Sequence, residues 1–354
     1  MQWNLVNSHV DLHGQLNFIF DLPYWMDPAH TYRAIFIQSQ ASWFVVTGQD
    51  FTIDAHRTGG IVGNGQHWWS WYGNATRLDG DGRPVALSLV NVTRGTVRDF
   101  TVDSPPFWCN AVADARDVVY DGMRCIAQNA DATYFGQNIV WNTDGIDTFR
   151  ADNITLRNFD ITSGDDCLAI KGVKALEHSQ IARERTNEST GIAFGSLGQY
   201  ADLPDYVNNV LLEDVTLIQP DPQIYFKSWT GTRIGFPPTG GGAGGGRVSG
   251  VVVRNVKLEN VTTPIQLYQT NLGHPGDAPS KLQFANLTFE NWTGTAQGAT
   301  MVDFECSPAA PCENLSFKSI DVAPPMGTSP TYSCVNVASV SGLPAGACPA
   351  VKKA

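Results

Sequence analysis

Short stretches of alternating apolar and polar residues recur along the chain, and each follows a turn residue that is often Asn or Asp. Such stretches begin at Gly95, Arg116, Asp152, Asn208, Arg254, Ala285 and Glu313. Each stretch is too short to bury its apolar face alone, whereas stacked units can share one continuous core. The pattern therefore predicts an all-β solenoid, and the uneven spacing of roughly 20 to 40 residues predicts corner loops of different lengths.

Helical periodicity is scarce along the same sequence. Residues 173–186 have apolar spacings that would also fit a helix, but their place between two repeat units favours a pair of strands. The glycine-rich run 237–246 is followed directly by another repeat unit, so we interpret it as a flexible loop rather than a domain linker. We therefore expect a single domain over residues 1–354, with an N-terminal cap and a signal peptide missing from its beginning.

The composition narrows the range of partners. Only 16% of the residues are charged, and the formal net charge is −11. An acidic protein is a poor partner for nucleic acid or an anionic membrane, and no apolar run approaches the ~20 residues needed to span a bilayer. An acidic protein can still bind an acidic polymer, but the cleft of the protein must then carry local basic residues. We expect a monomer that binds neither nucleic acid nor membrane.

The seven cysteines and eight N-x-S/T sequons favour secretion. The close pairs Cys306–Cys312 and Cys334–Cys348 bracket turn-rich segments, as disulfides that clip loops do in an oxidising compartment. Cys109, Cys125 and Cys167 remain, so at least one thiol is left over. Sequons lie at Asn74, Asn91, Asn153, Asn187, Asn260, Asn286, Asn291 and Asn314. We expect an extracellular glycoprotein, although some sequons also arise from the turn-then-strand pattern.

Two acidic motifs carry the candidate chemistry. Asp144 lies in Asn-Thr-Asp-Gly, and Asp165 and Asp166 follow 21 and 22 residues later in Gly-Asp-Asp-Cys. A spacing of about one coil stacks such residues on adjacent strands, ~4.8 Å apart. Crowded carboxylates repel one another, which raises at least one pKa. A protonated acid beside an ionised base suits glycoside hydrolysis. The alternatives are ordinary turn chemistry or a calcium site.

These motifs resemble those of the polygalacturonase family, glycoside hydrolase family 28. The resemblance rests on Asn142-Thr-Asp-Gly145, Gly164-Asp-Asp-Cys-Leu-Ala-Ile-Lys171, Gly191-Ile-Ala-Phe-Gly-Ser-Leu-Gly198 and Tyr225-Phe-Lys227. It covers essentially the whole chain and implies a right-handed parallel β-helix that hydrolyses α-linked pectin backbones with inversion, without a metal or cofactor.

Positions in the motifs imply roles for individual residues. Asp165 would be the general acid, while Asp144 and Asp166 would hold and deprotonate the attacking water. Lys227 would meet a galacturonate carboxylate beside the scissile bond, as a specific anion contact in an acidic protein. Asn142, Thr190 and Tyr225 would also face the substrate.

Three departures from the family pattern bear on the substrate. Thr190 replaces the histidine of a Gly-His-Gly motif, and Tyr225 replaces the arginine of Arg-Ile-Lys. A downstream Gln-x-Tyr reads Gln269-Thr-Asn271, although Gln266-Leu-Tyr268 also fits. Fewer cationic contacts suit the exo-acting rhamnogalacturonan branch, which would release terminal α-L-rhamnose next to galacturonate. The alternatives are an exo- or endo-polygalacturonase, or a pectin-binding β-helix that has lost catalysis.

Aromatic residues could stack on sugar rings. Trp68, Trp69 and Trp71 form a dense patch that fits core packing equally well, whereas Trp108 precedes the acidic motifs by one or two coils and is the better candidate for the cleft. In the family that this chain resembles, the cysteine at the position of Cys167 forms a disulfide. Thr186 stands at the position of the partner, so the resemblance implies that Cys167 is a buried free thiol. A calcium-dependent lyase is disfavoured because no arginine adjoins the Asp cluster.

Overall fold

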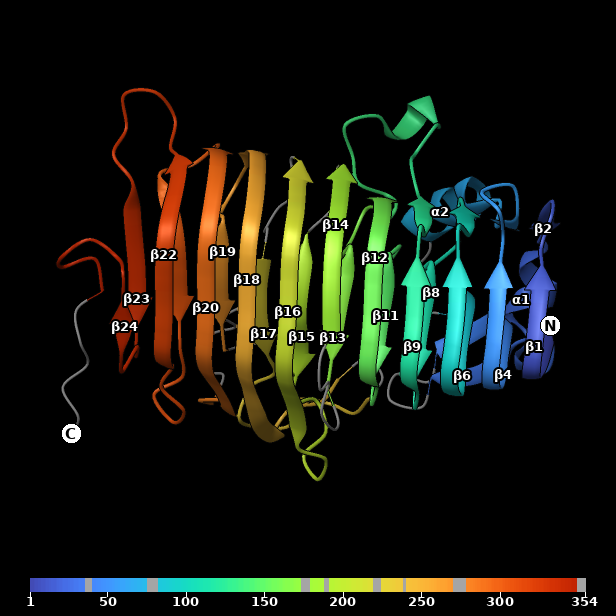
Figure 1. Ribbon diagram of the computed structural model, residues 1–354, viewed down its shortest axis with the longest axis horizontal. Coiled ribbons are helices and arrows are strands. Elements are labelled where there is room, and N and C mark those ends of the chain that lie inside the picture. The colour runs from blue at the N-terminus through green and yellow to red at the C-terminus, as the bar shows by residue number, and fades with distance from the viewer. Residues whose placement is uncertain are drawn as a thin grey trace.

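The computed structural model describes residues 1–35, 40–74, 82–172, 179–187, 191–218, 224–237, 240–269 and 278–348. Strands of successive coils lie side by side and pair in parallel, so that the molecule is one long stack from β1 near the N-terminus to β24 near the C-terminus (Figure 1). Only β3 pairs with its neighbour β4 in the antiparallel sense among the described strands. The predicted solenoid is therefore confirmed as a parallel β-helix.

Each coil combines a long, bent strand with a short strand on another face. The long strands are β1 (Gln2–Asp11), β4 (Gln40–Asp54), β6 (Val85–Arg98), β12 (Asp152–Thr162), β14 (Ser179–Asn187), β16 (Asp205–Ile218), β18 (Gly245–Val261), β20 (Lys281–Ala296) and β22 (Glu313–Ala323). The short strands are β8 (Asn110–Ala113), β11 (Ile146–Phe149), β13 (Leu168–Lys171), β15 (Ile192–Leu197), β17 (Ile224–Ser228), β19 (Ile265–Tyr268), β21 (Thr300–Glu305) and β23 (Thr331–Val335). The other elements are β2 (Gln15–Asn17), β3 (Tyr32–Ile35), β5 (Gly60–Val62), β7 (Thr101–Asp103), β9 (Arg116–Asp121), β10 (Arg124–Ile126), β24 (Val340–Ser341), the helices α1 (Leu22–Met26) and α2 (Gly65–Asn74), and the 3₁₀ turns η1 (Pro28–His30) and η2 (Ala132–Tyr134).

The Asn and Asp residues of the repeat make the bends in the long strands. Asp214, Asn255 and Asn291 occupy equivalent corners of three coils and have φ angles of 56°, 56° and 57°. Asn and Asp tolerate this left-handed conformation better than other non-glycine residues. Each Asn amide also donates to the preceding coil, Asn255 to Asp214 Oδ1 at 3.0 Å and Asn291 to Asn255 Oδ1 at 2.8 Å. The turn signal in the sequence therefore marks a ladder that fixes one corner of the coil.

Apolar side chains that alternate along each strand point into a core that runs the length of the stack. Ile192 pairs with Ile224, and the rings of Phe194 and Phe226 stack at 4.5 Å on neighbouring coils. Residues 179–187 are a strand, as predicted for the second half of segment 173–186, while residues 173–178 lie outside the described part. The tryptophan patch belongs to packing, because Trp68 and Trp69 of α2 are fully buried.

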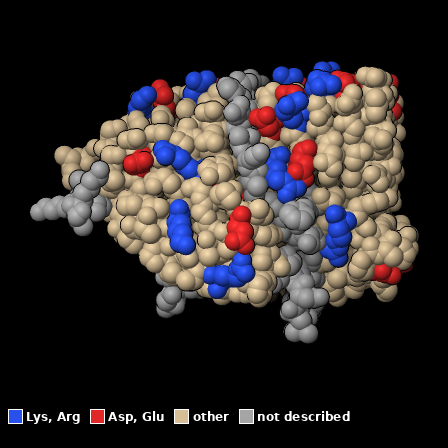
Figure 2. All heavy atoms as spheres, turned by 90° about the horizontal axis from the view of Figure 1, so that it is seen from below, with Lys and Arg blue, Asp and Glu red and all other residues tan. Residues whose placement is uncertain are grey.

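Three disulfides stabilise the loops: Cys109–Cys125, Cys306–Cys312 and Cys334–Cys348. Cys167 is a buried thiol outside these disulfides, as expected. No described helix is long and apolar enough to cross a membrane. On the face seen in Figure 2, basic and acidic side chains are interspersed and no basic patch stands out.

Candidate active site

The short strands build a flat face on which outward residues of successive coils lie in rows. Asp147 of β11 pairs with Ala169, which pairs with Ala193, which pairs with Tyr225 of β17. The two alanine side chains are short, so no bulky group of this row stands between Asp147 and Tyr225. A second row contains Phe149 beside Lys171, and Lys227 beside Tyr268.

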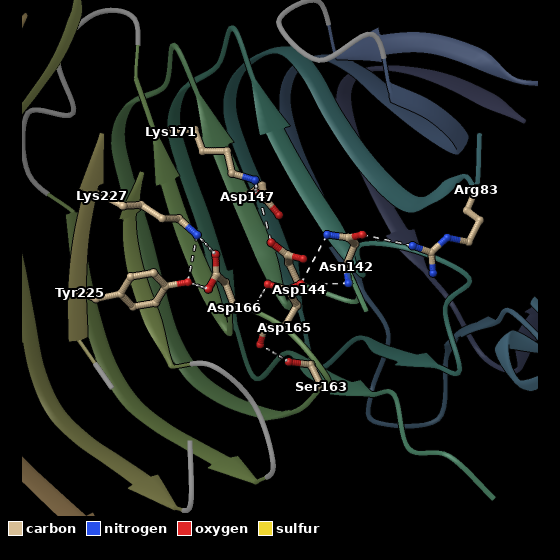
Figure 3. Close-up of polar contacts among 10 residues, drawn as sticks. All are labelled: Arg83, Asn142, Asp144, Asp147, Ser163, Asp165, Asp166, Lys171, Tyr225 and Lys227. Carbon is tan, nitrogen blue, oxygen red and sulfur yellow. Dashed lines mark hydrogen bonds and ion pairs between the residues drawn. The ribbon is translucent and has the colours of Figure 1, made fainter. Parts of the chain in front are cut away.

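Asp144, Asp165 and Asp166 come together at the edge of this face, as the spacing predicted. Asp144 lies in the turn before β11, and the other two lie in the turn before β13 (Figure 3). One carboxylate oxygen from each lies within 4.8 Å of the others. Gly145 permits this close stacking, because a Cβ there would lie 2.4 Å from the carbonyl oxygen of Cys167. Three carboxylate oxygens in this arrangement are also of the type that ligates a cation.

Burial and mutual repulsion raise the pKa values of Asp144 and Asp165. Asp144 is only 3% exposed. Loss of hydration, followed by the charges of Asp147 and Asp165, raises its pKa well above the ordinary value. Burial and then the charge of Asp166 raise the pKa of Asp165. Among the described residues, no protein group donates to Asp144 Oδ1. The site can therefore retain a proton on a carboxyl group.

Asp165 is held at both of its carboxylate oxygens. The backbone N–H of Asn142 donates to Oδ2 at 3.0 Å, and the N–H of Asp166 donates to Oδ1 at 2.9 Å. The Asn142 amide adds a longer contact to Oδ2 at 3.4 Å. Ser163 Oγ donates to the Asp165 carbonyl oxygen at 2.8 Å. Asn142, expected to face the substrate, is half-buried and contacts Asp165, and its position supports that carboxyl group.

Tyr225 and Lys227 of β17 both reach Asp166. The Tyr225 hydroxyl donates to Asp166 Oδ1, and Lys227 Nζ lies 3.4 Å from Oδ2 and 3.0 Å from the Tyr225 hydroxyl (Figure 3). Burial, followed by the charge of Asp166, raises the pKa of the buried Tyr225 phenol well above its ordinary value. Tyr225, expected to contact substrate in the place of an arginine, is committed to Asp166. The Lys227 side chain keeps 20% exposure and can meet a ligand.

The downstream aromatic residue, which was expected to be lost, is present at the site as Tyr268. It pairs with Lys227 in the sheet register, and its ring stacks beside that of Tyr225 with centroids 6.4 Å apart. It is partly exposed, whereas Gln269 is buried and donates to the carbonyl oxygen of Leu282. Gln266-Leu-Tyr268 is therefore the segment that brings an aromatic side chain to the site. Thr190 lies outside the described residues.

Asp147 and Lys171 are site residues that the sequence reasoning missed. Lys171 Nζ makes an ion pair with the fully buried Asp147 and lies 3.9 Å from Asp144 Oδ2. Burial raises the pKa of Asp147 to about 7. Asp147 follows the first acidic motif by two residues, and Lys171 is the last residue of the second. The period-2 alternation of a strand would have placed them outward, on the same face as the carboxylates.

A hydrophobic cluster covers the same face on the N-terminal side of Lys171, and we call it the end wall. It consists of Val45, Val85, Val90, Phe107, Trp108, Ala111, Ala113 and Phe149, with Ala34 and Tyr200 packed against it. Trp108 is 2% exposed and stacks between the rings of Phe107 at 4.9 Å and Phe149 at 5.8 Å. Lys171 Nζ lies 4.2 Å from its ring centroid. The expectation that Trp108 stacks on a sugar is therefore wrong, because its ring is taken up by the wall.

Comparison with known proteins agrees with this geometry. The sequence profile described as "Glycosyl hydrolases family 28" matches residues 9–346. An Aspergillus niger protein with the provisional name galacturan 1,4-alpha-galacturonidase A is 35% identical over 97% of this chain and 82% of its own length. A Neosartorya fischeri protein provisionally named exopolygalacturonase B is 30% identical, over 96% of this chain and 73% of its own. The crystal structure of endo-xylogalacturonan hydrolase from Aspergillus tubingensis superposes with a TM-score of 0.81 at 21% identity, covering 99% of this chain and 86% of that one, and shows the same fold.

Proposed function

Because the chain belongs to glycoside hydrolase family 28 and is a pectin-degrading hydrolase, we propose that it cleaves the pectin backbone from a chain end and releases terminal galacturonate. The observation that carries the exo-acting assignment is the end wall. It fills the outward face up to Lys171, next to the carboxylates. A polysaccharide that lies along this face can therefore extend past the carboxylates in one direction only. The names of the two curated relatives agree with removal of terminal galacturonate.

The carboxylates divide the chemistry between them. Asp165 donates its proton to the glycosidic oxygen as the bond from that oxygen to C1 breaks. A water held by Asp144 and Asp166 attacks C1 from the opposite side, and its proton passes to one of these carboxylates. Asp144 is nearly fully buried, and its Oδ1 accepts from no described protein group. Asp166 already accepts from Tyr225 and contacts Lys227, which fixes its orientation.

The proposal includes inversion of the anomeric configuration during hydrolysis. Inverting enzymes usually separate their two carboxyl groups by ~6.5–9.5 Å to leave room for water. Here one oxygen from each of three carboxylates lies within 4.8 Å. With three groups, two can share the water while the third acts as acid, so we retain inversion. Polarimetry or proton NMR of the first product would decide, since a retained anomeric configuration requires a carboxylate nucleophile instead.

Lys227 is the residue that we assign to the substrate carboxylate. Burial alone lowers the pKa of its ammonium group, but the charges of Asp166 and of neighbouring groups outweigh burial and raise it well above the ordinary value. Its side chain is partly exposed on the side of the carboxylates away from the end wall, which we call the open side, next to the partly exposed Tyr268. A galacturonate bound there would make a charge-assisted contact with Lys227.

Tyr225 favours one alternative substrate. A phenol that is committed to Asp166 gives no second cation on the open side, which suits a bond between a neutral sugar and a single galacturonate. That arrangement corresponds to release of terminal α-L-rhamnose from rhamnogalacturonan. A module that only binds pectin has no chemical need for the crowded carboxylates.

Product analysis separates these possibilities. We would incubate the enzyme with oligogalacturonides labelled at the reducing end, and with rhamnogalacturonan oligosaccharides that end in rhamnose. Free galacturonate, with labelled chains that shorten by one sugar at a time, is the expected result. Free rhamnose alone would transfer the assignment to the alternative substrate. Labelled fragments of many lengths at early times would contradict exo action.

The setting of this activity is also part of the proposal. We propose that residues 1–354 act as one monomeric catalytic unit outside the cell. The three disulfides, which are typical of oxidising compartments, support the extracellular assignment.

A further inference from the structure

We infer that Arg83 is a positioning residue of the active site, which orients Asp165 through the peptide group that joins Trp141 to Asn142. Arg83 lies in the segment before β6, far from the acidic motifs in sequence. The inference rests on the role of Asp165 as general acid in the proposed function. It adds a residue that neither the motifs nor the fold assigns to the site.

Arg83 is fully buried, and its guanidinium group is directed at the turn that carries Asn142 (Figure 3). One terminal nitrogen donates to the carbonyl oxygens of Pro106 at 3.1 Å and Trp141 at 2.9 Å. The other donates to Asn142 Oδ1 at 3.3 Å. The guanidinium carbon lies 3.8 Å from the ring centroid of Tyr72. Burial of a cation is costly unless its donors are used, so this geometry is tightly determined.

The Trp141 carbonyl and the Asn142 N–H belong to the same peptide group, and this makes the connection rigid. Arg83 holds the oxygen of that planar unit at 2.9 Å, and Asp165 Oδ2 accepts from its nitrogen at 3.0 Å. A charged donor on the oxygen also polarises the unit and strengthens the bond that the N–H makes. Asn142 has a φ of 57°, in the left-handed region that Asn tolerates, and its side-chain oxygen accepts from Arg83 at 3.3 Å.

Loss of Arg83 should change the protonation of Asp165 as well as its orientation. The charged and titratable groups that act on Asp165 or are acted on by it are Asp144, Asp147, Asp166, Tyr225, Lys227 and Tyr268. None of these changes when Arg83 is replaced. The Asn142 N–H bond lowers the pKa of Asp165 and opposes the effect of burial. A weaker bond therefore leaves the pKa of Asp165 higher and its carboxyl group less firmly oriented.

The first test compares two substrates in Arg83→Lys and Arg83→Gln. An oligogalacturonide needs a proton on its leaving oxygen, whereas a 2,4-dinitrophenyl galacturonide has a leaving group that departs without one. We expect kcat on the oligogalacturonide to fall roughly 10-fold or more, within the ~10²–10⁴-fold that a general acid contributes. The KM and the rate on the aryl substrate should change little. The control Arg254→Gln, which removes an exposed arginine paired with Glu213, should leave both substrates unaffected.

The pH profile gives a second reading on the same variants. The alkaline limb of kcat/KM, where the acid loses its proton, should move to higher pH in Arg83→Gln and less so in Arg83→Lys. Equal losses on both substrates with an unmoved limb would show that Arg83 only supports the fold, and the inference would fall.

A titration without substrate keeps this inference separate from the proposed function. Carbon NMR of the aspartate carboxyl groups, with Asp165 assigned by its disappearance in Asp165→Asn, should give a higher midpoint for Asp165 in Arg83→Gln than in the wild type. An unchanged midpoint overturns the inference. If the wild-type enzyme cleaves neither substrate, the proposed function fails, and the NMR titration still decides whether Arg83 positions Asp165.

Discussion

The outward face of the short strands has two ends that share the same parallel strand pairing but carry different side chains. On the N-terminal side of Lys171, the positions are filled by the buried Phe149, Ala111 and their neighbours in the end wall. On the C-terminal side of Lys227, the same rows carry Gln266 and Tyr268, which are partly exposed, and then the exposed Glu305. The end wall is therefore made by apolar side chains on the same regular face, with Ala34 and Tyr200 packed against them.

The two lysines mark the boundary between these ends. Lys171 is 12% exposed and lies between Asp147 and the ring of Trp108, so its charge is used within the protein. Lys227 is 20% exposed and faces the open side beside Tyr268. The two lysines therefore differ in their surroundings, and the Lys227 side chain is the more exposed of the two.

The largest effect on this comparison should come from Asp165→Asn, which removes the proposed acid between the two ends. We expect kcat to fall by ~10²–10⁴-fold, because an amide cannot protonate the leaving oxygen. The N–H groups of Asn142 and Asp166 donate to different oxygens of Asp165, and an amide has only one oxygen, so one N–H loses its acceptor and we expect a small loss of stability within an intact fold. Initial-rate kinetics on oligogalacturonides, with a melting curve as control, provides the measurement. Near-full turnover would remove Asp165 from the acid role.

Trp108→Ala should open the end wall and alter the products. Truncation of a buried tryptophan costs about 3–5 kcal/mol of unfolding free energy, which denaturant titration would measure. Space beyond the carboxylates should also let a chain extend past them, so oligogalacturonide products longer than one sugar are expected.

A matched control separates the wall from stability in general. Trp292→Ala removes an equally buried tryptophan from the central core, away from the outward face. It should lower stability to a similar extent and leave the single-sugar product unchanged. If both variants kept the single-sugar pattern, the wall would not be what enforces action at the chain end.

The stacking of the acidic motifs could be predicted from the sequence because it depends on coil length alone. Asp144 and Asp165, 21 residues apart, come together because the strands that follow them pair Ile146 with Leu168, one short coil apart. The Asn corners and the close cysteine pairs are local in the same sense.

Contacts that join distant coils could not be predicted in this way. The Tyr225 hydroxyl meets Asp166 across 59 residues, and Arg83 meets Trp141 across 58. Whether these side chains meet depends on loop lengths and rotamers that no periodic pattern records. The burial of Trp108 has the same origin, because Tyr200 and Phe149 from other coils close around the cluster to which it belongs.

The smallest effect, and the most specific test of the open end, is expected from Lys227→Met. Loss of one charge-assisted contact, worth ~1.5–3 kcal/mol, should raise KM for an oligogalacturonide roughly 10-fold or more. A methyl-esterified oligogalacturonide has no carboxylate for the lysine, so the wild type and the variant should differ much less on it. Lys318→Met, which removes an exposed lysine paired with Glu290, is the matched control and should change neither substrate. An equal loss on both substrates would mean that Lys227 acts through Asp166, and the open side would then carry no assigned anion contact.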